Sequence, residues 1–214
     1  EIVGFLRLMN EKCQIAFLGS DEIAIPFLEV LKDFFPGVGL CAVLTQPDRP
    51  AGRGRKLRQN PIKRWSLANK LPLRDPPKPG LDEVNWLSEL QVDLLLVMAY
   101  GCILKTEMLQ VAPRGCFNLH ASILPAYRGA SPIETALACG ERETGVTLMR
   151  VVPKMDAGPI IGYIFLNHLV VVALCSCWMP AWPLDTFFLN LDLFFVFFWA
   201  TFFLVLASVF LTSF

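Results

Sequence analysis

Histidine is scarce in this chain: its 214 residues contain only two, His120 and His168. The seven cysteines form no CxxC pair and no grouping with a histidine at the spacing of a zinc site. The sequence therefore contains no metal-binding motif, and the scattered cysteines are typical of buried thiols in a reducing compartment. No GxGxxG or P-loop motif follows the first apolar run, which argues against a dinucleotide or ATP site at that turn.

Charge is nearly missing from the last quarter of the chain. All 19 lysines and arginines lie at or before Lys154, and only two of the 19 acidic residues, Asp185 and Asp192, lie beyond Asp156. Residues 163–214 also hold 11 of the 17 phenylalanines. The preceding part carries 19 basic and 17 acidic residues, a net charge of +2 that is ordinary for a soluble domain. The composition therefore divides the chain into a globular domain and a hydrophobic tail.

The tail has two interpretations. Residues 193–214 are 22 residues without a charge, and a membrane-spanning helix needs about 20. They are either a C-terminal membrane anchor, without flanking lysine or arginine to set its orientation, or sequence that is joined to the domain and is not an evolved part of it. We expect an N-terminal extension over 1–12, one domain over 13–163 and the tail over 164–214. The apolar stretch at the start is too short and interrupted for a signal peptide, so the expected location is cytoplasmic, with an organelle as the alternative.

Apolar runs and amphipathic segments alternate through the globular part. Runs typical of buried strands lie at 13–20, 38–45, 92–100, 115–120, 145–152 and 158–166. Segments with the apolar spacing of helices lie at 21–34, 60–70, 81–90 and 131–140. This alternation predicts an α/β fold with an open, mostly parallel, Rossmann-like sheet. Such sheets bind ligands at the carboxyl ends of their strands.

Asn118 and His120 stand at one of these strand ends. Residues two apart on a strand face the same way, so the amide and the imidazole project together. An amide donor beside an imidazole can stabilise an oxyanion and move a proton. Asp156 follows the next strand, where a carboxylate could orient His120. The plain alternative is a structural asparagine, a buried histidine and an aspartate that only forms a turn.

The segment 46–61 is strongly basic and lacks the periodicity of a core element. It contains Asp48 as its one acidic residue against five basic ones, a net charge of +4. Glycine and proline interrupt it, which predicts an exposed loop. Lysine and arginine in such a loop can neutralise phosphates and position an RNA, and the alternative is a solvated basic loop without a partner.

The ordered motifs after Cys116 resemble the core of the folate-dependent formyltransferases. They are Asn118-x-His120, Ser122-Ile123-Leu124-Pro125, Arg128-Gly129, Pro132, Glu143–Thr147 and Asp156-x-Gly158. Ile123 replaces the leucine of the family pattern, and the resemblance covers roughly residues 13–163. The family continues with a closing helix and a C-terminal barrel, and nothing in the tail matches either of them.

Within this family, residues 45–73 are similar to the members that formylate methionyl-tRNA. The resemblance implies 10-formyltetrahydrofolate as the co-substrate, initiator methionyl-tRNA as the partner, and no metal. It implies a catalytic set of Asn118, His120 and Asp156. It implies folate contacts from Met98, Tyr100, Gly101, Ile103, Ser122, Leu124 and Pro125. It implies tRNA contacts from Arg49, Arg53, Arg55 and Lys56.

Two other functions stay open at this point. The first is formyl transfer to a small amine, such as a nucleotide sugar, by an enzyme of the same fold. The second is a truncated, inactive, membrane-associated product, because the closing helix and the barrel of the family are missing. Assays with methionyl-tRNA against small amines would separate the first from the main prediction.

Overall fold

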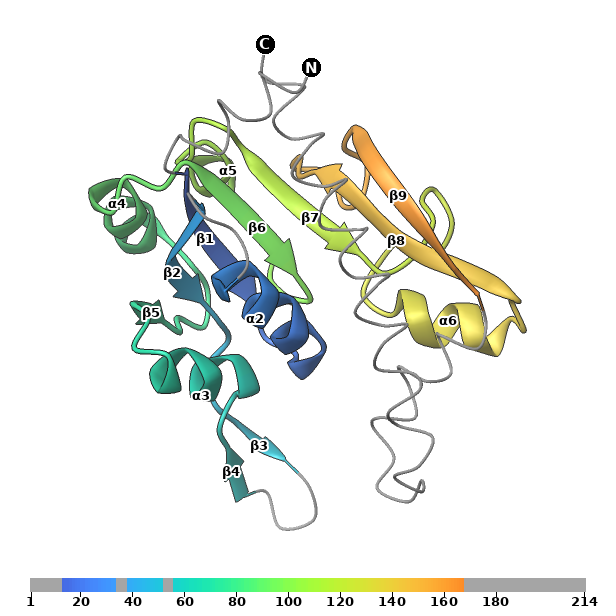
Figure 1. Ribbon diagram of the computed structural model, residues 1–214, viewed down its shortest axis with the longest axis horizontal. Helices are drawn as coiled ribbons and strands as arrows, with labels where there is room; N and C mark the ends of the chain where they lie inside the picture. The colour runs from blue at the N-terminus through green and yellow to red at the C-terminus, as the bar shows by residue number, and fades with distance from the viewer. Residues whose placement is uncertain (1–12, 34–37, 52–55, 168–214) are drawn as a thin grey trace. The chain divides into compact units, whose positions relative to one another are not determined.

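The computed structural model describes residues 13–33, 38–51 and 56–167, and contacts divide the chain into two compact units (Figure 1). The N-terminal unit contains the described residues up to Leu119 together with Arg150–Met155. The C-terminal unit contains His120–Met149 and the described residues from Asp156 onward. The apolar segment 193–214 lies outside the described residues. Within the described part, no helix combines the length and the apolar character needed to cross a membrane.

Five parallel strands form the sheet of the N-terminal unit, in the order β5-β2-β1-β6-β7 (Figure 1). Their bounds are β1 (Cys13–Gly19), β2 (Val38–Leu44), β5 (Leu73–Arg74), β6 (Leu94–Met98) and β7 (Cys116–His120), whose last residue belongs to the C-terminal unit. The expected mostly parallel α/β sheet is confirmed. The order changes direction between β1 and β6, so the loops after these two strands mark the position where open α/β sheets bind ligands.

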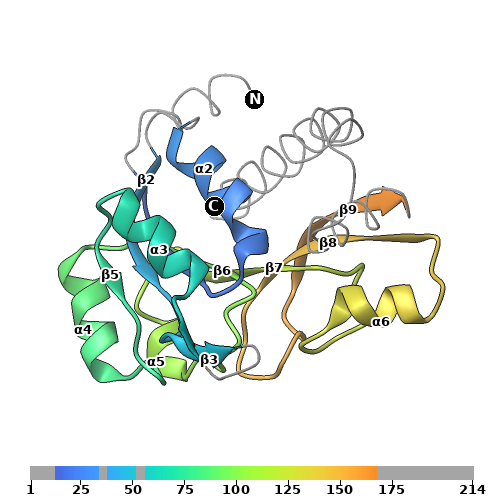
Figure 2. The same cartoon turned by 90° about the horizontal axis from the view of Figure 1, so that it is seen from below.

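Helices cover both faces of this sheet (Figure 2). A 3-10 turn, η1 (Glu22–Ala24), leads into α2 (Ile25–Asp33), which shares one face with α3 (Pro61–Ala68). The opposite face carries α4 (Leu81–Glu89) and α5 (Thr106–Leu109). The sequence predicted one helix from Asp21, and the structure begins it as the 3-10 turn, with the Asp21 carboxylate accepting from the Ile23 N–H.

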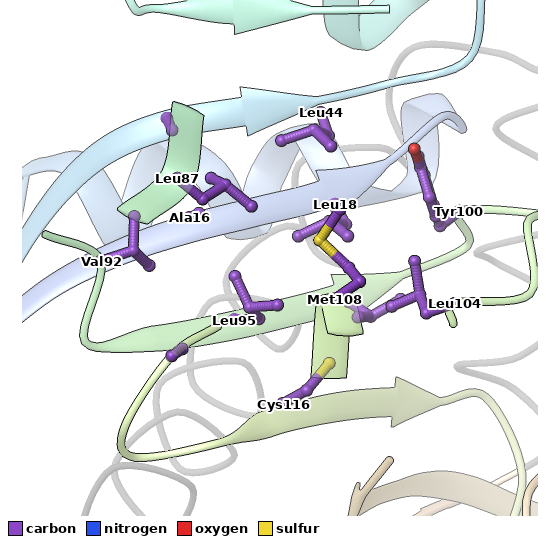
Figure 3. Packing of buried hydrophobic residues seen from close by; sticks show 13 residues of the cluster. Ala16, Leu18, Leu44, Leu87, Val92, Leu95, Tyr100, Leu104, Met108 and Cys116 are labelled. Carbon is purple, nitrogen blue, oxygen red and sulfur yellow. The ribbon is translucent and has the colours of Figure 1, made fainter. Parts of the chain in front are cut away.

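Alternate side chains of β1 point to opposite faces of the sheet. Ala16 and Leu18 are fully buried in a cluster with Leu87 of α4 and Met108 of α5 (Figure 3). On the other face, the ring of Phe17 lies 6.3 Å from that of Phe27 in α2. Each leucine buried in this way contributes about 1.5–3 kcal/mol relative to an exposed one. Because both faces are covered, the strand period of two explains why residues 15–18 are all apolar.

The C-terminal unit is built on an antiparallel pair, β8 (Glu143–Arg150) and β9 (Ile160–Asn167), with the helix α6 (Pro132–Ala138). The sequence predicted both strands, but it did not indicate that they run antiparallel. Gly145 is required in β8, because a Cβ there would lie 1.9 Å from the Ile164 carbonyl oxygen. Gly140 has a φ of 71° and ends α6, as the sequence predicted.

A short antiparallel hairpin interrupts the connection between β2 and α3. Its strands are β3 (Arg49–Ala51) and β4 (Lys56–Arg58), and Arg49 pairs with Arg58 across the ladder. The sequence predicted only a loop here, because basic residues between glycines and prolines give no apolar alternation. Residues 52–55, which include Arg53 and Arg55, lie outside the described residues.

All five described cysteines are free thiols. Burial raises the pKa of the Cys116 thiol to about 12 and that of Cys13 to about 11. These thiols are therefore protonated at neutral pH and act as small apolar side chains.

Candidate active site

His120 and Asp156 lie together in the C-terminal unit. The His120 Nδ1 atom is 3.9 Å from Asp156 Oδ2, and the side chains are only 6% and 12% exposed. This distance is an ion-pair contact that is too long for a hydrogen bond. Asp156 is far from His120 in sequence and reaches it from the turn between β8 and β9.

Both ring nitrogens of His120 face protein oxygen atoms. The Nε2 atom lies 3.0 Å from the carbonyl oxygen of Tyr127, while Nδ1 faces the Asp156 carboxylate. Of these two contacts, only the one at Nε2 is within hydrogen-bonding distance, because Nδ1 is 3.9 Å from the carboxylate oxygen.

A backbone amide fixes the Asp156 carboxylate. Its Oδ2 atom accepts from the Gly129 N–H at 2.9 Å. Asp156 adopts a φ of 46° in the left-handed region, which aspartate tolerates better than most side chains. Gly129 has a φ of 107°, which favours glycine at that position. The Arg128-Gly129 motif therefore has a structural reason: the glycine presents its N–H to the carboxylate.

Thr147 of β8 holds the loop that follows His120. Its hydroxyl donates to the Ser122 carbonyl at 2.6 Å and accepts from the Leu124 N–H at 3.1 Å. The Ser122 hydroxyl donates to the Ala126 carbonyl at 2.6 Å. Ser122 and Thr147 are fully buried and Pro125 is exposed. The Ser122 hydroxyl thus stabilises the conformation of this loop. Sequence reasoning assigned no role to Thr147, although it closes the Glu143–Thr147 motif.

Asn118 precedes His120 by two residues on β7 and is half-buried. The other four residues of β7 are buried, and residues two apart on a strand face the same way. The amide and the imidazole thus stand on the same face of one strand. Asn118 belongs to the N-terminal unit and His120 to the C-terminal unit.

The last residue of β6 and the segment after it contain four of the residues expected to contact folate. Tyr100 is only 2% exposed and burial raises its pKa, whereas Ile103 is 75% exposed. Met98 is half-buried, and Gly101 is exposed with a φ of 71°. These residues therefore differ widely in accessibility, and the exposed ones follow the strand end.

Ser20 ties together the ends of three strands in this region. Its hydroxyl donates to the Tyr100 carbonyl at 3.1 Å and accepts from the Gln46 N–H at 3.2 Å, so the residues after β1, β2 and β6 are joined. Three buried polar atoms of the residues after β2 and β6 have no hydrogen-bond partner in the part of the chain that the structure describes: Thr45 Oγ1, Gln46 Nε2 and Tyr100 Oη. The carboxyl ends of β2 and β6 therefore hold unused hydrogen-bonding capacity. Sequence reasoning assigned no role to Ser20 or Gln46.

The basic hairpin, defined as the strands β3 and β4, exposes its charged side chains. Arg49, Lys56 and Arg58 are all exposed. Arg49 donates from Nη2 to the Gln46 side-chain oxygen at 2.6 Å. Because Arg49 and Arg58 pair across the ladder, two like charges stand side by side. This juxtaposition is unfavourable for the hairpin alone and creates a site of positive potential for an anion.

The described residues contain no group of three His, Cys, Asp or Glu side chains that could hold a metal ion. The C-terminal unit buries the His120 imidazole between the Asp156 carboxylate and the Tyr127 carbonyl oxygen. Such a pair can accept and return a proton, and an adjacent amide can stabilise negative charge on oxygen.

A family model described as "Formyl transferase" matches residues 13–164. Methionyl-tRNA formyltransferase of Methylococcus capsulatus is 49% identical over 150 residues, which are 70% of this chain and 48% of that protein. Methionyl-tRNA formyltransferase of Halorhodospira halophila is 45% identical over 148 residues, which are 69% of this chain and 47% of that protein. The chain thus spans about half the length of these curated relatives.

Solved structures share the fold at lower identity. Phosphoribosylglycinamide formyltransferase from Anaplasma phagocytophilum matches with a TM-score of 0.61 and 22% identity, over 78% of this chain and 79% of that one. A formyltetrahydrofolate deformylase from Pseudomonas syringae matches with a TM-score of 0.61 and 17% identity, over 74% of this chain and 52% of that one. These similarities concern the fold alone.

Proposed function

Because the chain belongs to the formyl transferase family, we propose that it transfers a formyl group from 10-formyltetrahydrofolate to the amino group of methionyl-initiator tRNA. The contact between His120 and Asp156 carries the chemical part of this proposal. The acceptor is supported by curated relatives named methionyl-tRNA formyltransferase. The proposal includes a cytoplasmic location, where a charged tRNA and a reduced folate would meet, and free thiols agree with a reducing compartment.

The proposed folate site follows strand β6, at the reversal of strand order. The co-substrate supplies an activated formyl group on a nitrogen that can leave. Met98, Tyr100, Gly101 and Ile103 would contact it, and the unpartnered atoms at the ends of β2 and β6 suit a ring with polar edges. We propose that Ser122, Leu124 and Pro125 contribute backbone and packing contacts, since the Ser122 hydroxyl already binds Ala126.

Proton movement is the task proposed for His120. The acceptor amine forms a C–N bond to the formyl carbon, while the carbonyl electron pair moves to oxygen. Breaking the bond to the folate nitrogen then returns that pair to the carbonyl. His120 takes the proton from the attacking amine and delivers it to the departing nitrogen. Asp156 stabilises the imidazolium between these steps, and its own position is fixed by the Gly129 N–H.

Asn118 is proposed to donate its side-chain amide to the developing oxyanion. Such a donor is more valuable in the transition state than in the ground state, because the oxygen carries more charge there. Asn118→Ala should lower turnover by about 10²–10³-fold. Folate affinity, measured by fluorescence titration, should change little. Unchanged turnover would remove Asn118 from the reaction.

The acceptor is tested by giving the full chain a labelled formyl donor and a choice of amines. Methionyl-initiator tRNA, a nucleotide amino sugar and free methionine would be compared at equal concentration. The proposal expects formylation of the tRNA only. Faster transfer to the amino sugar would assign the chain to small-amine formylation, and a folate-binding chain without any transfer would show that this chain alone is inactive.

A further inference from the structure

Three charged side chains meet at the base of the basic hairpin, and we call them the Lys63 cluster. The Lys63 Nζ atom lies 3.1 Å from Asp48 Oδ2 and 2.7 Å from Asp75 Oδ2. All three side chains are partly buried, at 24%, 21% and 35% exposed for Lys63, Asp48 and Asp75. Asp48 follows β2 and Asp75 follows β5, which are neighbours in the sheet. Lys63 of α3 therefore joins the ends of two adjacent parallel strands.

Asp48 also closes the hairpin. Its Oδ1 atom accepts from the Asn60 N–H at 2.9 Å, and these two residues flank β3 and β4. Asn60 in turn caps α3 by accepting from the Ile62 and Lys63 N–H groups. The Asn60 N–H, with help from the Lys63 ammonium, lowers the pKa of Asp48. The carboxylate therefore stays ionised while it fixes both legs of the hairpin.

The pairing of Lys63 with Asp48 decides how much positive charge the hairpin shows. Asp48 is the one acidic residue between 46 and 61. Its carboxylate pairs with Lys63, a lysine outside that segment that also contacts Asp75, and Arg49 binds the neutral amide oxygen of Gln46. Among the described residues, none of the hairpin's cations forms an ion pair. Their charge is thus left available for an anionic partner.

We propose that Lys63 is a positioning residue for RNA phosphates: it keeps the Asp48 carboxylate away from the hairpin arginines and anchors the base of the hairpin. This inference rests on the proposed function, since it takes the acceptor to be a tRNA. Partly exposed ion pairs contribute little to stability, so the main effect of the cluster is on charge and geometry. Without Lys63, the freed carboxylate neutralises a hairpin cation and removes one phosphate contact.

The test uses the full chain and initiator tRNA, with the dissociation constant measured by fluorescence anisotropy at a series of salt concentrations. Lys63→Met should weaken binding by about three- to tenfold, and the slope of log K against log salt should become shallower by about one. Asp48→Asn added to Lys63→Met should restore most of the affinity. The added amide removes the freed charge and can still accept from the Asn60 N–H.

Lys32→Met is the matched control. Lys32 also lies near two carboxylates, those of Glu29 and Asp33, but it stands on α2 away from the hairpin. It should leave both the affinity and the salt slope unchanged. Folate affinity and the melting temperature, measured for every variant, show whether a loss of tRNA binding comes from unfolding.

Two results would overturn the inference while leaving the proposed function in place. The first is that the Lys63→Met variant binds tRNA with the affinity and salt slope of the parent chain. The second is that Lys63→Met weakens tRNA binding and that adding Asp48→Asn does not restore it, since a purely structural role predicts no recovery from a second substitution. If the parent chain transfers formyl groups to small amines but does not bind tRNA, the proposed acceptor is wrong and the inference falls with it.

Discussion

The His120–Asp156 pair and the basic hairpin handle charge in opposite ways. In the C-terminal unit, imidazole and carboxylate are buried and face each other, and further backbone groups contact both. In the hairpin, cations are exposed and stand beside one another, and the nearby carboxylate is occupied by Lys63. Burial strengthens electrostatic interactions and suits bond making, whereas exposure leaves charge free to attract a distant polyanion. Under the proposed function, we therefore expect catalysis and tRNA recognition to be separable by mutation.

Replacing the imidazole should give the largest effect. His120→Gln keeps a polar side chain at the end of β7 but removes the group that is proposed to move the proton. Turnover should fall by about 10²–10⁴-fold, the usual contribution of a general acid–base. Formylation kinetics at saturating tRNA would measure it, with Cys139→Ser, an exposed position in the same unit, as the control. If only the KM for tRNA changed, the proposed division of roles between the His120–Asp156 pair and the basic hairpin would be wrong.

Removing one hairpin charge should give a smaller and different effect. Arg49→Gln deletes a cation that forms no ion pair with any described residue, and it should raise the KM for tRNA about threefold at physiological salt with kcat unchanged. The loss should shrink as salt is added, because fewer counterions are released on binding. A kcat change of the same size at all salt concentrations would show that the hairpin takes part in chemistry.

Replacing Thr147 tests how much its hydrogen bonds stabilise the loop after His120. Thr147→Val keeps the shape of the side chain but leaves the buried Leu124 N–H without its acceptor. The free energy of unfolding in urea should fall by about 1–3 kcal/mol. Thr135→Val removes an exposed hydroxyl from α6 and should cost about 0.5 kcal/mol or less. Equal losses for the two would mean that the loop after His120 is not held by Thr147.

The regular elements were predictable because their signals are local. Asn60 and Pro61 start α3, and the apolar runs of β1 and β6 mark buried strands. The short elements β3, β4, β5 and α5 were missed, since two to four residues carry no measurable period. The antiparallel direction of β9 depends on pairing with β8, which no local pattern encodes.

The candidate site was predictable in a different sense. Residue types and spacing indicated Asn118 and His120 and left Asp156 open as either a partner of His120 or a turn former, because the approach of Asp156 to His120 depends on the tertiary fold. The contacts of Thr147, Gly129 and the Tyr127 carbonyl were not predicted, since each depends on a loop conformation. The Lys63 cluster was missed for the same reason: its three charges come from separate segments and meet only in the folded chain.

Asp156→Asn offers the most direct test of the central claim that the carboxylate serves the imidazole. The amide oxygen can still accept from the Gly129 N–H, and asparagine tolerates the left-handed backbone, so only the charge beside His120 is lost. Single-turnover formyl transfer, with both substrates saturating, should slow by about 10²-fold or more, while folate affinity and melting temperature stay unchanged. A variant that transfers the formyl group as fast as the parent chain would contradict the account.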